Sequence, residues 1–148
     1  MDGGGRRLQG LVAVASLAGI GISIYLTAVH YTSVPLVCST TGAINCEAVL
    51  TSPYSVIAGS NVPTSAAGIA WFAVSAALAI WMWAGRGSAL VARLQLAWSA
   101  LGLLTVIGLV FIEIVVLGAI CIWCTAAHVL VVAIFLIALW RVRGRVRA

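Results

Sequence analysis

The chain has 148 residues, of which 64% are hydrophobic and only 7% are charged, and its formal net charge is +5. Soluble domains usually carry about 25% charged residues, so this composition excludes a soluble globular protein and indicates an integral membrane protein. The eight basic residues are all arginine and flank apolar segments instead of forming a helical stripe, which argues against nucleic-acid binding.

Four apolar segments are each long enough to cross the roughly 30 Å hydrocarbon core of a membrane as a helix. We expect membrane spans at about residues 8–31, 63–84, 94–112 and 116–140. The last two form one apolar run that is too long for a single helix, so the chain must reverse near Glu113 to Gly118. The predicted fold is an all-α integral membrane protein: one domain over residues 1–148, a four-transmembrane-helix bundle, with no fused thioredoxin domain.

Arginines flank the predicted spans in three clusters, at residues 6–7, 86–93 and 141–147. Four spans bring all three clusters to one side, and the positive-inside rule assigns that side to the cytoplasm. We therefore expect a multi-pass protein of the inner or plasma membrane with both termini cytoplasmic. The large loop at about residues 32–62, with room for a short helix at 46–50, would then face the exported side.

Cys121 and Cys124 form a C-x-x-C pair at the predicted exported end of the fourth span. Two cysteines one helical turn apart project from the same face, so their disulfide can form and break without refolding. A helix that begins near Gly118 would put both sulfurs in its first turns, where the helix N-terminus favours the thiolate. The remaining cysteines, Cys38 and Cys46, lie in the exported loop, so both pairs face an oxidising compartment.

Other uses of these cysteines are possible. A buried cysteine is often an inert core residue, and Cys38 and Cys46 alone could be a structural staple of the loop. The seven residues between them fit poorly with the spacing of two to four usual in a zinc site, so no metal is expected. An exposed, mobile loop pair could meet both a soluble protein and the membrane dithiol, which favours an electron relay.

Beyond the cysteines, the matching features are the VLTSPY run at residues 49–54, the VP pair at 62–63 leading to Gly68, and residues 113–124. With these motifs the chain, over about residues 8–140, resembles the bacterial homologues of the vitamin K epoxide reductase family. The resemblance implies four helices around a quinone, menaquinone or ubiquinone, and a loop that forms a partial lid. It also implies that the protein generates disulfides for the folding of exported proteins.

The same resemblance assigns roles to the four cysteines. It implies that Cys124 donates electrons to the quinone and that Cys121 is its partner toward the loop. Cys46 would exchange with Cys121, and Cys38 would form the mixed disulfide with a separate thioredoxin-like exported protein of the DsbA type. Each transfer is the attack of a thiolate on a disulfide sulfur.

Three further residues are candidates near the quinone, and a fourth, Glu113, has several alternative roles. Ser52 matches a family position that can hydrogen-bond a quinone oxygen, and it could equally be a cap or loop serine. His128 stands where the animal enzymes have tyrosine, and it could contact the quinone or another helix. Trp123 could shield the disulfide or wall the quinone, and Glu113 could be a solvated turn residue, a proton acceptor or a partner of the loop.

Two other functions use the same residues. The first is a quinone or quinone-epoxide reductase whose main product is hydroquinone, because the direction of transfer depends on the potentials of the partners. The second is a non-catalytic membrane protein whose disulfides are structural. Replacing Cys38 separates the relay from the staple, because only the relay would trap a bond between Cys46 and Cys121.

Overall fold

The computed structural model describes residues 3–32, 35–38, 41–57 and 59–146. Its elements are α1 (Gly3–Tyr31), α2 (Cys46–Leu50), η1 (Pro53–Ser55), α3 (Thr64–Trp81), η2 (Met82–Arg86), α4 (Ala89–Phe111), η3 (Ile112–Leu117) and α5 (Ile122–Val146). Among the described residues, four helices, two of them extended by η2 and η3, are long and apolar enough to cross a membrane. The predicted all-helical fold with four candidate spans is confirmed, as is the short helix at residues 46–50.

The reversal between the last two spans lies later than the predicted start of the fourth helix. Helix α4 continues through the π-helical turn η3, and Gly118 ends it in the left-handed conformation, with φ 62°. The backbone N–H groups of Gly118 and Ala119 both donate to the carbonyl of Glu113, the latter at 3.0 Å. As a result α5 begins at Ile122 and not near residue 116.

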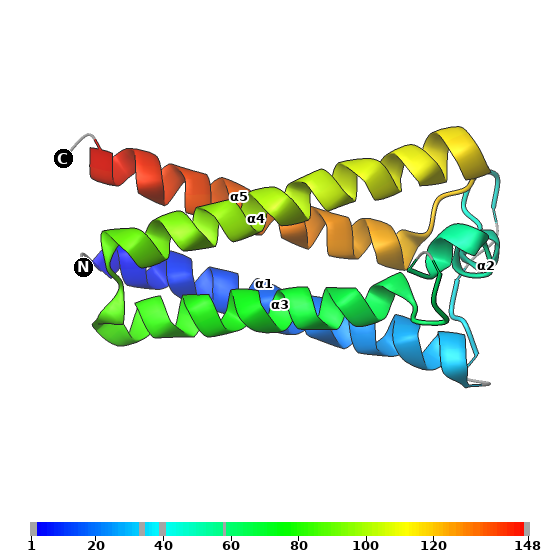
Figure 1. The fold of residues 1–148 in the computed structure, drawn as a ribbon, viewed down its shortest axis with the longest axis horizontal. Helices are drawn as coiled ribbons and strands as arrows, with labels where there is room; N and C mark the ends of the chain where they lie inside the picture. Colours follow the sequence, from blue (N-terminus) through cyan, green and yellow to red (C-terminus); the bar gives the residue numbers. More distant parts are fainter. Residues whose placement is uncertain (1–2, 33–34, 39–40, 58, 147–148) are drawn as a thin grey trace.

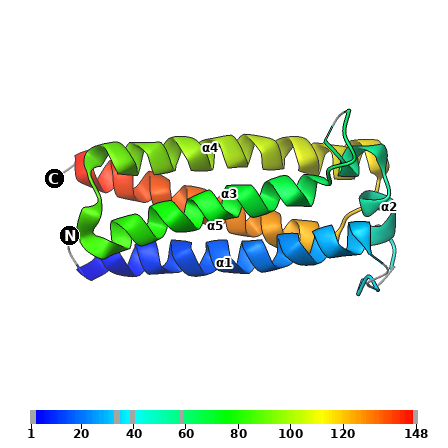
Figure 2. The ribbon, with the colours of Figure 1, turned by 60° about the horizontal axis from the view of Figure 1, so that its bottom comes forward.

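The four long helices run side by side, and α2 with η1 covers one end of the bundle (Figures 1 and 2). Both chain termini lie at the opposite end. Arg6 stacks on Trp83 and Arg86 on Trp81 at that terminal end. Arg147 and the side chain of Arg145 lie outside the described residues.

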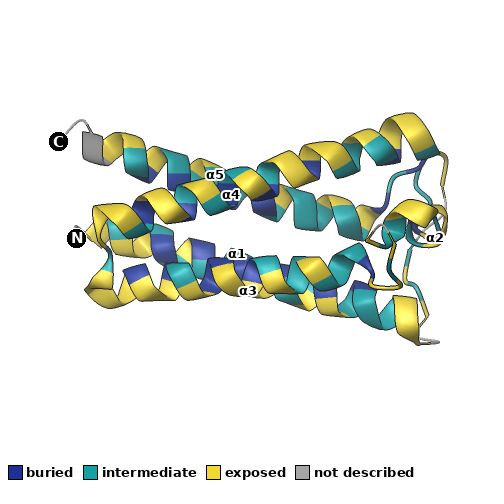
Figure 3. Cartoon of the chain, in the orientation of Figure 1, coloured by how far each residue is buried: buried dark blue, intermediate teal, exposed yellow. Residues whose placement is uncertain are grey.

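Apolar side chains cover both the inside and the outside of this bundle. The buried core joins all four long helices through Val12, Phe72, Ala79, Val106, Val131 and Ile134. The outward faces carry exposed residues along their length (Figure 3), and many are large and hydrophobic, such as Leu17, Leu104 and Val129. Water would penalise such surfaces, whereas lipid does not, and the backbone is satisfied within the helices. The chain is a multi-pass membrane protein.

Polar side chains of the spans turn inward. Gln9 on α1 and Gln95 on α4 are buried and exchange two amide hydrogen bonds, at 3.0 and 3.1 Å. Interhelical hydrogen bonds of this kind link helices in lipid, where polar groups find no water. This pair ties α1 to α4 in the half of the bundle nearer the termini, which leaves the other half to form the site.

Candidate active site

The loop disulfide lies against the membrane dithiol. Cys38 and Cys46 are bonded, with their Cα atoms 6.2 Å apart, while Cys121 and Cys124 are free thiols. Cys46 and Cys121 are both 0% exposed and share one hydrophobic cluster. The structure thus shows an oxidised pair and a reduced pair in direct proximity.

Main-chain pairing explains how segments far apart in the sequence meet at this point. The N–H of Ile120 donates to the carbonyl of Ala43 at 2.8 Å, and the N–H of Asn45 donates to the carbonyl of Ile120 at 3.1 Å. Asn45 directly precedes Cys46 in the sequence, and Ile120 directly precedes Cys121. Asn45 also caps α2, since its side chain accepts the N–H of Ala48 at 3.0 Å.

The two thiols occupy different positions at the start of α5. Cys121 directly precedes the helix, and its sulfur accepts the N–H of Cys124 at 3.4 Å, as an N-cap side chain does. The side-chain hydrogen bond with Cys124 lowers the pKa of the Cys121 thiol, although burial and the negative charge of Glu113 oppose this. This hydrogen bond therefore favours loss of the Cys121 proton when the pair is oxidised.

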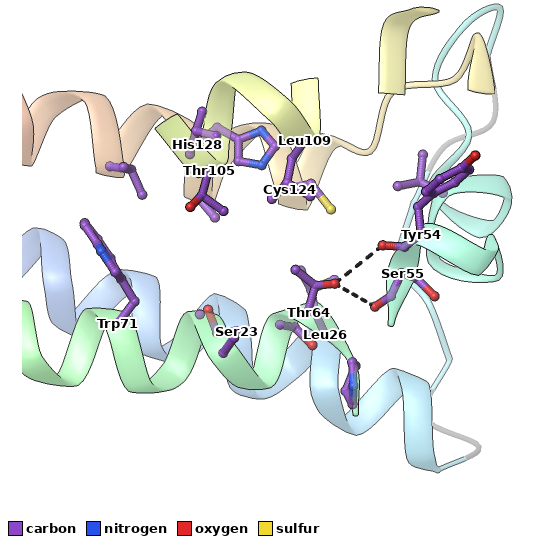
Figure 4. A pocket seen from close by; sticks show the side chains of 18 of the residues that line it. Ser23, Leu26, Tyr54, Ser55, Thr64, Trp71, Thr105, Leu109, Cys124 and His128 are labelled. Atoms are coloured by element: carbon purple, nitrogen blue, oxygen red, sulfur yellow. Dashed lines mark hydrogen bonds between the residues drawn. The ribbon is translucent and has the colours of Figure 1, made fainter. Parts of the chain in front are cut away.

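Cys124 opens into a cavity of about 400 Å³ inside the half of the bundle next to α2. Figure 4 shows Cys124 and His128 on one wall and Ser23 and Thr64 on the other. Most lining residues are apolar, and the volume lies within the roughly 300–1,000 Å³ of typical small-molecule sites. A flat, lipid-soluble molecule with one or two polar atoms fits such a lining.

The predicted quinone contacts separate into two groups. Ser52 and His128 line the cavity, and the Ser52 hydroxyl donates to the carbonyl of Val49 at 2.8 Å. The hydroxyl must rotate away from this carbonyl before it can donate to a ligand. Trp123 is not among the described residues that line the cavity.

Trp123 instead holds the loop. Its indole N–H donates to the carbonyl of Val37 at 2.8 Å, next to Cys38 in sequence. Tyr25, with its ring centroid 5.0 Å from that of Trp123, accepts the N–H of Val37 at 2.9 Å and donates to the carbonyl of Pro35 at 3.3 Å. We call Tyr25 and Trp123 the loop anchor.

Sequence reasoning missed several residues of this site. The sequence by itself assigns no function to Tyr25 or His30, yet Tyr25 binds the loop and His30 lines the cavity. Glu113, read as a possible solvated turn residue, is only 6% exposed. Its carboxylate accepts the N–H of Cys121 at 3.3 Å. The burial excludes the solvated-turn reading.

Within the part of the chain that the structure describes, no group of three or more His, Cys, Asp or Glu side chains is arranged to hold a metal ion.

The comparison with protein families gives one match. The model described as the Vitamin K epoxide reductase family matches residues 10–139, which is most of the chain. A comparison with curated protein sequences finds no match. The family match covers α2, both cysteine pairs and the cavity described above.

Proposed function

Because the chain belongs to the vitamin K epoxide reductase family of oxidoreductases, we propose that it is a quinone-dependent thiol–disulfide oxidoreductase of the membrane. It takes electrons from a separate, exported thioredoxin-like protein of the DsbA type and passes them to menaquinone or ubiquinone. The product is a disulfide in the partner, which then serves the folding of exported proteins.

One observation supports this proposal above the others. Cys46 and Cys121 are buried in the same cluster, and Cys124, one helical turn further on, lines a cavity. A purely structural disulfide needs no second, reduced pair packed against it. Two pairs in contact, one of which reaches a ligand-sized space, are what stepwise electron transfer needs.

The electron path follows from thiol–disulfide exchange. A thiolate of the reduced partner attacks Cys38, which is half-buried, whereas Cys46 is fully buried. The released Cys46 thiolate then attacks the oxidised form of the second pair at Cys121, and a thiolate is released on Cys124. The second thiolate of the partner then attacks the mixed disulfide, which closes the partner's own disulfide and releases Cys38. The Cys38 thiolate attacks Cys46, which re-forms the loop disulfide and releases Cys121. The second pair ends as the dithiol that the structure contains.

The cavity suits a quinone in size and in chemistry. When bound there, a quinone accepts two electrons and two protons and leaves as the hydroquinone. Apolar walls hold the ring, Cys124 supplies electrons, and Ser52 and His128 are the polar side chains that we assign to its oxygen atoms. The residues that line the cavity suit a quinone, and Trp123 is not one of them.

The sidedness of the protein is part of the proposal. Arginines gather at the end of the bundle that holds both termini, whereas the cysteines lie at the end covered by α2. Cytoplasmic positive charge is the usual rule for short segments near spans. We therefore assign the termini to the cytoplasm and both cysteine pairs to the exported side, where the partner protein is available.

The decisive experiment measures quinone-dependent oxidation of a reduced thioredoxin-like protein by the purified chain in detergent. The native chain should turn over, and Cys124→Ala should not, because the dithiol can no longer close to a disulfide. Thr125→Ala, at the exposed position next to it, is the matched control and should retain activity. If the native chain oxidises no dithiol protein with any quinone, the proposal is wrong and the Cys38–Cys46 disulfide is structural.

A further inference from the structure

Glu113 is the one buried acidic side chain among the described residues. It stands in η3, its carboxylate accepts the N–H of Cys121 at 3.3 Å, and it lines the same cavity as Cys124. Glu113 therefore connects the reduced cysteine pair with the space into which that pair opens.

The position is costly for a carboxylate. A charged group in the apolar part of a membrane protein is unfavourable unless it is paired, and such groups usually have a function. The arginines at the terminal end are at the other end of the bundle from η3 (Figure 1). A neutral side chain would avoid this cost, so stability alone does not account for glutamate.

The turn after η3 is already held by the main chain. The carbonyl of Glu113 accepts the N–H groups of Gly118 and Ala119, and Ile120 is paired on both sides with the loop. The carboxylate adds one hydrogen bond, to the N–H of Cys121. A glutamine could make that bond without introducing a charge, so the hydrogen bond by itself does not require an acid.

Oxidation of the dithiol raises a question of protons. Closing the bond between Cys121 and Cys124 breaks two S–H bonds and releases two electrons and two protons. Cys121 is 0% exposed, so its proton has no direct path to bulk water. An acceptor must therefore lie within the protein, beside the sulfur and open to the cavity.

We propose that Glu113 is the proton acceptor of Cys121 and passes the proton on to the cavity. The proposal rests on the proposed quinone-linked function. As the disulfide forms, the Cys121 proton moves to the Glu113 carboxylate, and the two electrons and the Cys124 proton leave through the cavity. Glu113 then releases its proton to the reduced acceptor and returns to the carboxylate. Dithiol and quinone thereby become disulfide and hydroquinone, with atoms and charges balanced.

The electrostatics of the site agree with proton sharing. The negative charge of Glu113 raises the pKa of Cys121, against the stronger lowering by the hydrogen bond from Cys124. A thiolate on Cys121 and a carboxylate on Glu113 therefore repel each other, and one proton between them relieves that repulsion. The other titratable groups that line this cavity are Cys124 and His128 on α5, His30 on α1 and Tyr54 on η1, whereas Glu47 on α2 is exposed and lines a different pocket.

Three variants separate proton transfer from positioning. Glu113→Gln keeps an acceptor for the Cys121 N–H but cannot carry the proton, whereas Glu113→Asp keeps the acid with a shorter reach. Glu47→Gln, on the exposed face of α2, removes a carboxylate elsewhere and is the control. Proton transfer predicts the order Glu, Asp, Gln in the rate of dithiol oxidation, while positioning alone predicts that Gln equals Glu and exceeds Asp.

The first measurement is a single turnover of the prereduced chain with a water-soluble ubiquinone analogue, which needs no partner protein. General acid–base groups contribute about 10²- to 10⁴-fold, so Glu113→Gln should slow oxidation by roughly 10²-fold or more. Glu47→Gln should keep the native rate. A native rate in Glu113→Gln overturns the proposal. If that variant does not fold, an Asp variant with a rate as low as that of a Glu113→Ala chain also overturns it.

The second measurement uses no quinone. The rate at which Cys121 of the reduced chain is alkylated is followed against pH, with the labelled site identified by mass spectrometry. Removing the Glu113 charge lowers the pKa of Cys121, so the profile of Glu113→Gln should move to lower pH, while that of Glu47→Gln should not. An unmoved profile contradicts the coupling. If the native chain fails with quinone but the profile moves, the proposed function fails and the coupling stands.

Discussion

The loop anchor, Tyr25 and Trp123, should set how easily the loop disulfide is reached. Its three hydrogen bonds join Pro35 and Val37, the residues that lead to Cys38, to helices α1 and α5. We expect Tyr25→Phe and Trp123→Phe to speed reduction of the Cys38–Cys46 bond by a soluble dithiol. Each phenylalanine keeps an aromatic ring in the pair and removes only the polar contacts.

The magnitude follows from the number of bonds lost. A hydrogen bond contributes about 0.5–1.5 kcal/mol net, so Tyr25→Phe, which loses two, costs about 1–3 kcal/mol, and Trp123→Phe costs about half of that. Every 1.4 kcal/mol is about tenfold, which gives roughly 5- to 150-fold and 2- to 13-fold increases in local opening. Val37 is 70% exposed, so water replaces part of each lost bond and the lower ends apply.

The assay measures the rate of reduction of the loop disulfide by dithiothreitol in detergent, followed by alkylation and mass spectrometry. Tyr31→Phe is the matched control, because its hydroxyl donates to the carbonyl of Asn61 at 3.0 Å, outside the segment that leads to Cys38. The anchor has no such role if Tyr25→Phe and Tyr31→Phe are reduced at the same rate. A Tyr25→Phe chain that is slower than Trp123→Phe would contradict the bond count.

Two further predictions concern the exchange and the cavity. Cys38→Ala should accumulate a bond between Cys46 and Cys121, seen by peptide mapping without reductant, because no partner remains to resolve it; a chain with only free thiols speaks against the relay. Gly102→Ala would place a methyl group against the Trp71 ring, and overpacking of this kind costs about 1–3 kcal/mol. We expect a lower unfolding midpoint and a higher KM for quinone, because Trp71 lines the cavity; unchanged values would mean that the ring moves freely.

The long apolar runs and the spacing of the arginines were enough to predict four helices, since lipid imposes length and hydropathy on each span. The start of α5 was predicted too early. Residues 112–117 are as apolar as a helix start would be, apart from Glu113, and only the left-handed Gly118 decides where the reversal falls. A pattern of hydropathy does not contain that backbone angle.

The site was harder to predict because its contacts join distant segments. The pairing of Ile120 with residues 43–45 and the bond from Trp123 to Val37 are tertiary, and no local pattern signals either of them. Glu113 was read from its place near a turn, where charge is cheap to keep. The structure buries it because η3 extends α4 by more than a turn and lies in contact with α2.

In the proposed function one dithiol serves both a protein and a lipid-soluble acceptor, and the C-x-x-C interval explains how. Cys121 is buried in the same cluster as Cys46, whereas Cys124, three residues on, packs against that cluster and also lines the cavity. An α-helix rotates about 100° per residue, so one residue more or less between them would turn the second sulfur away from the cavity wall. The spacing keeps the sulfurs close enough to bond and yet directs them at different partners. Exchange with Cys46 and electron loss to the cavity can then occur at opposite sides of the same disulfide.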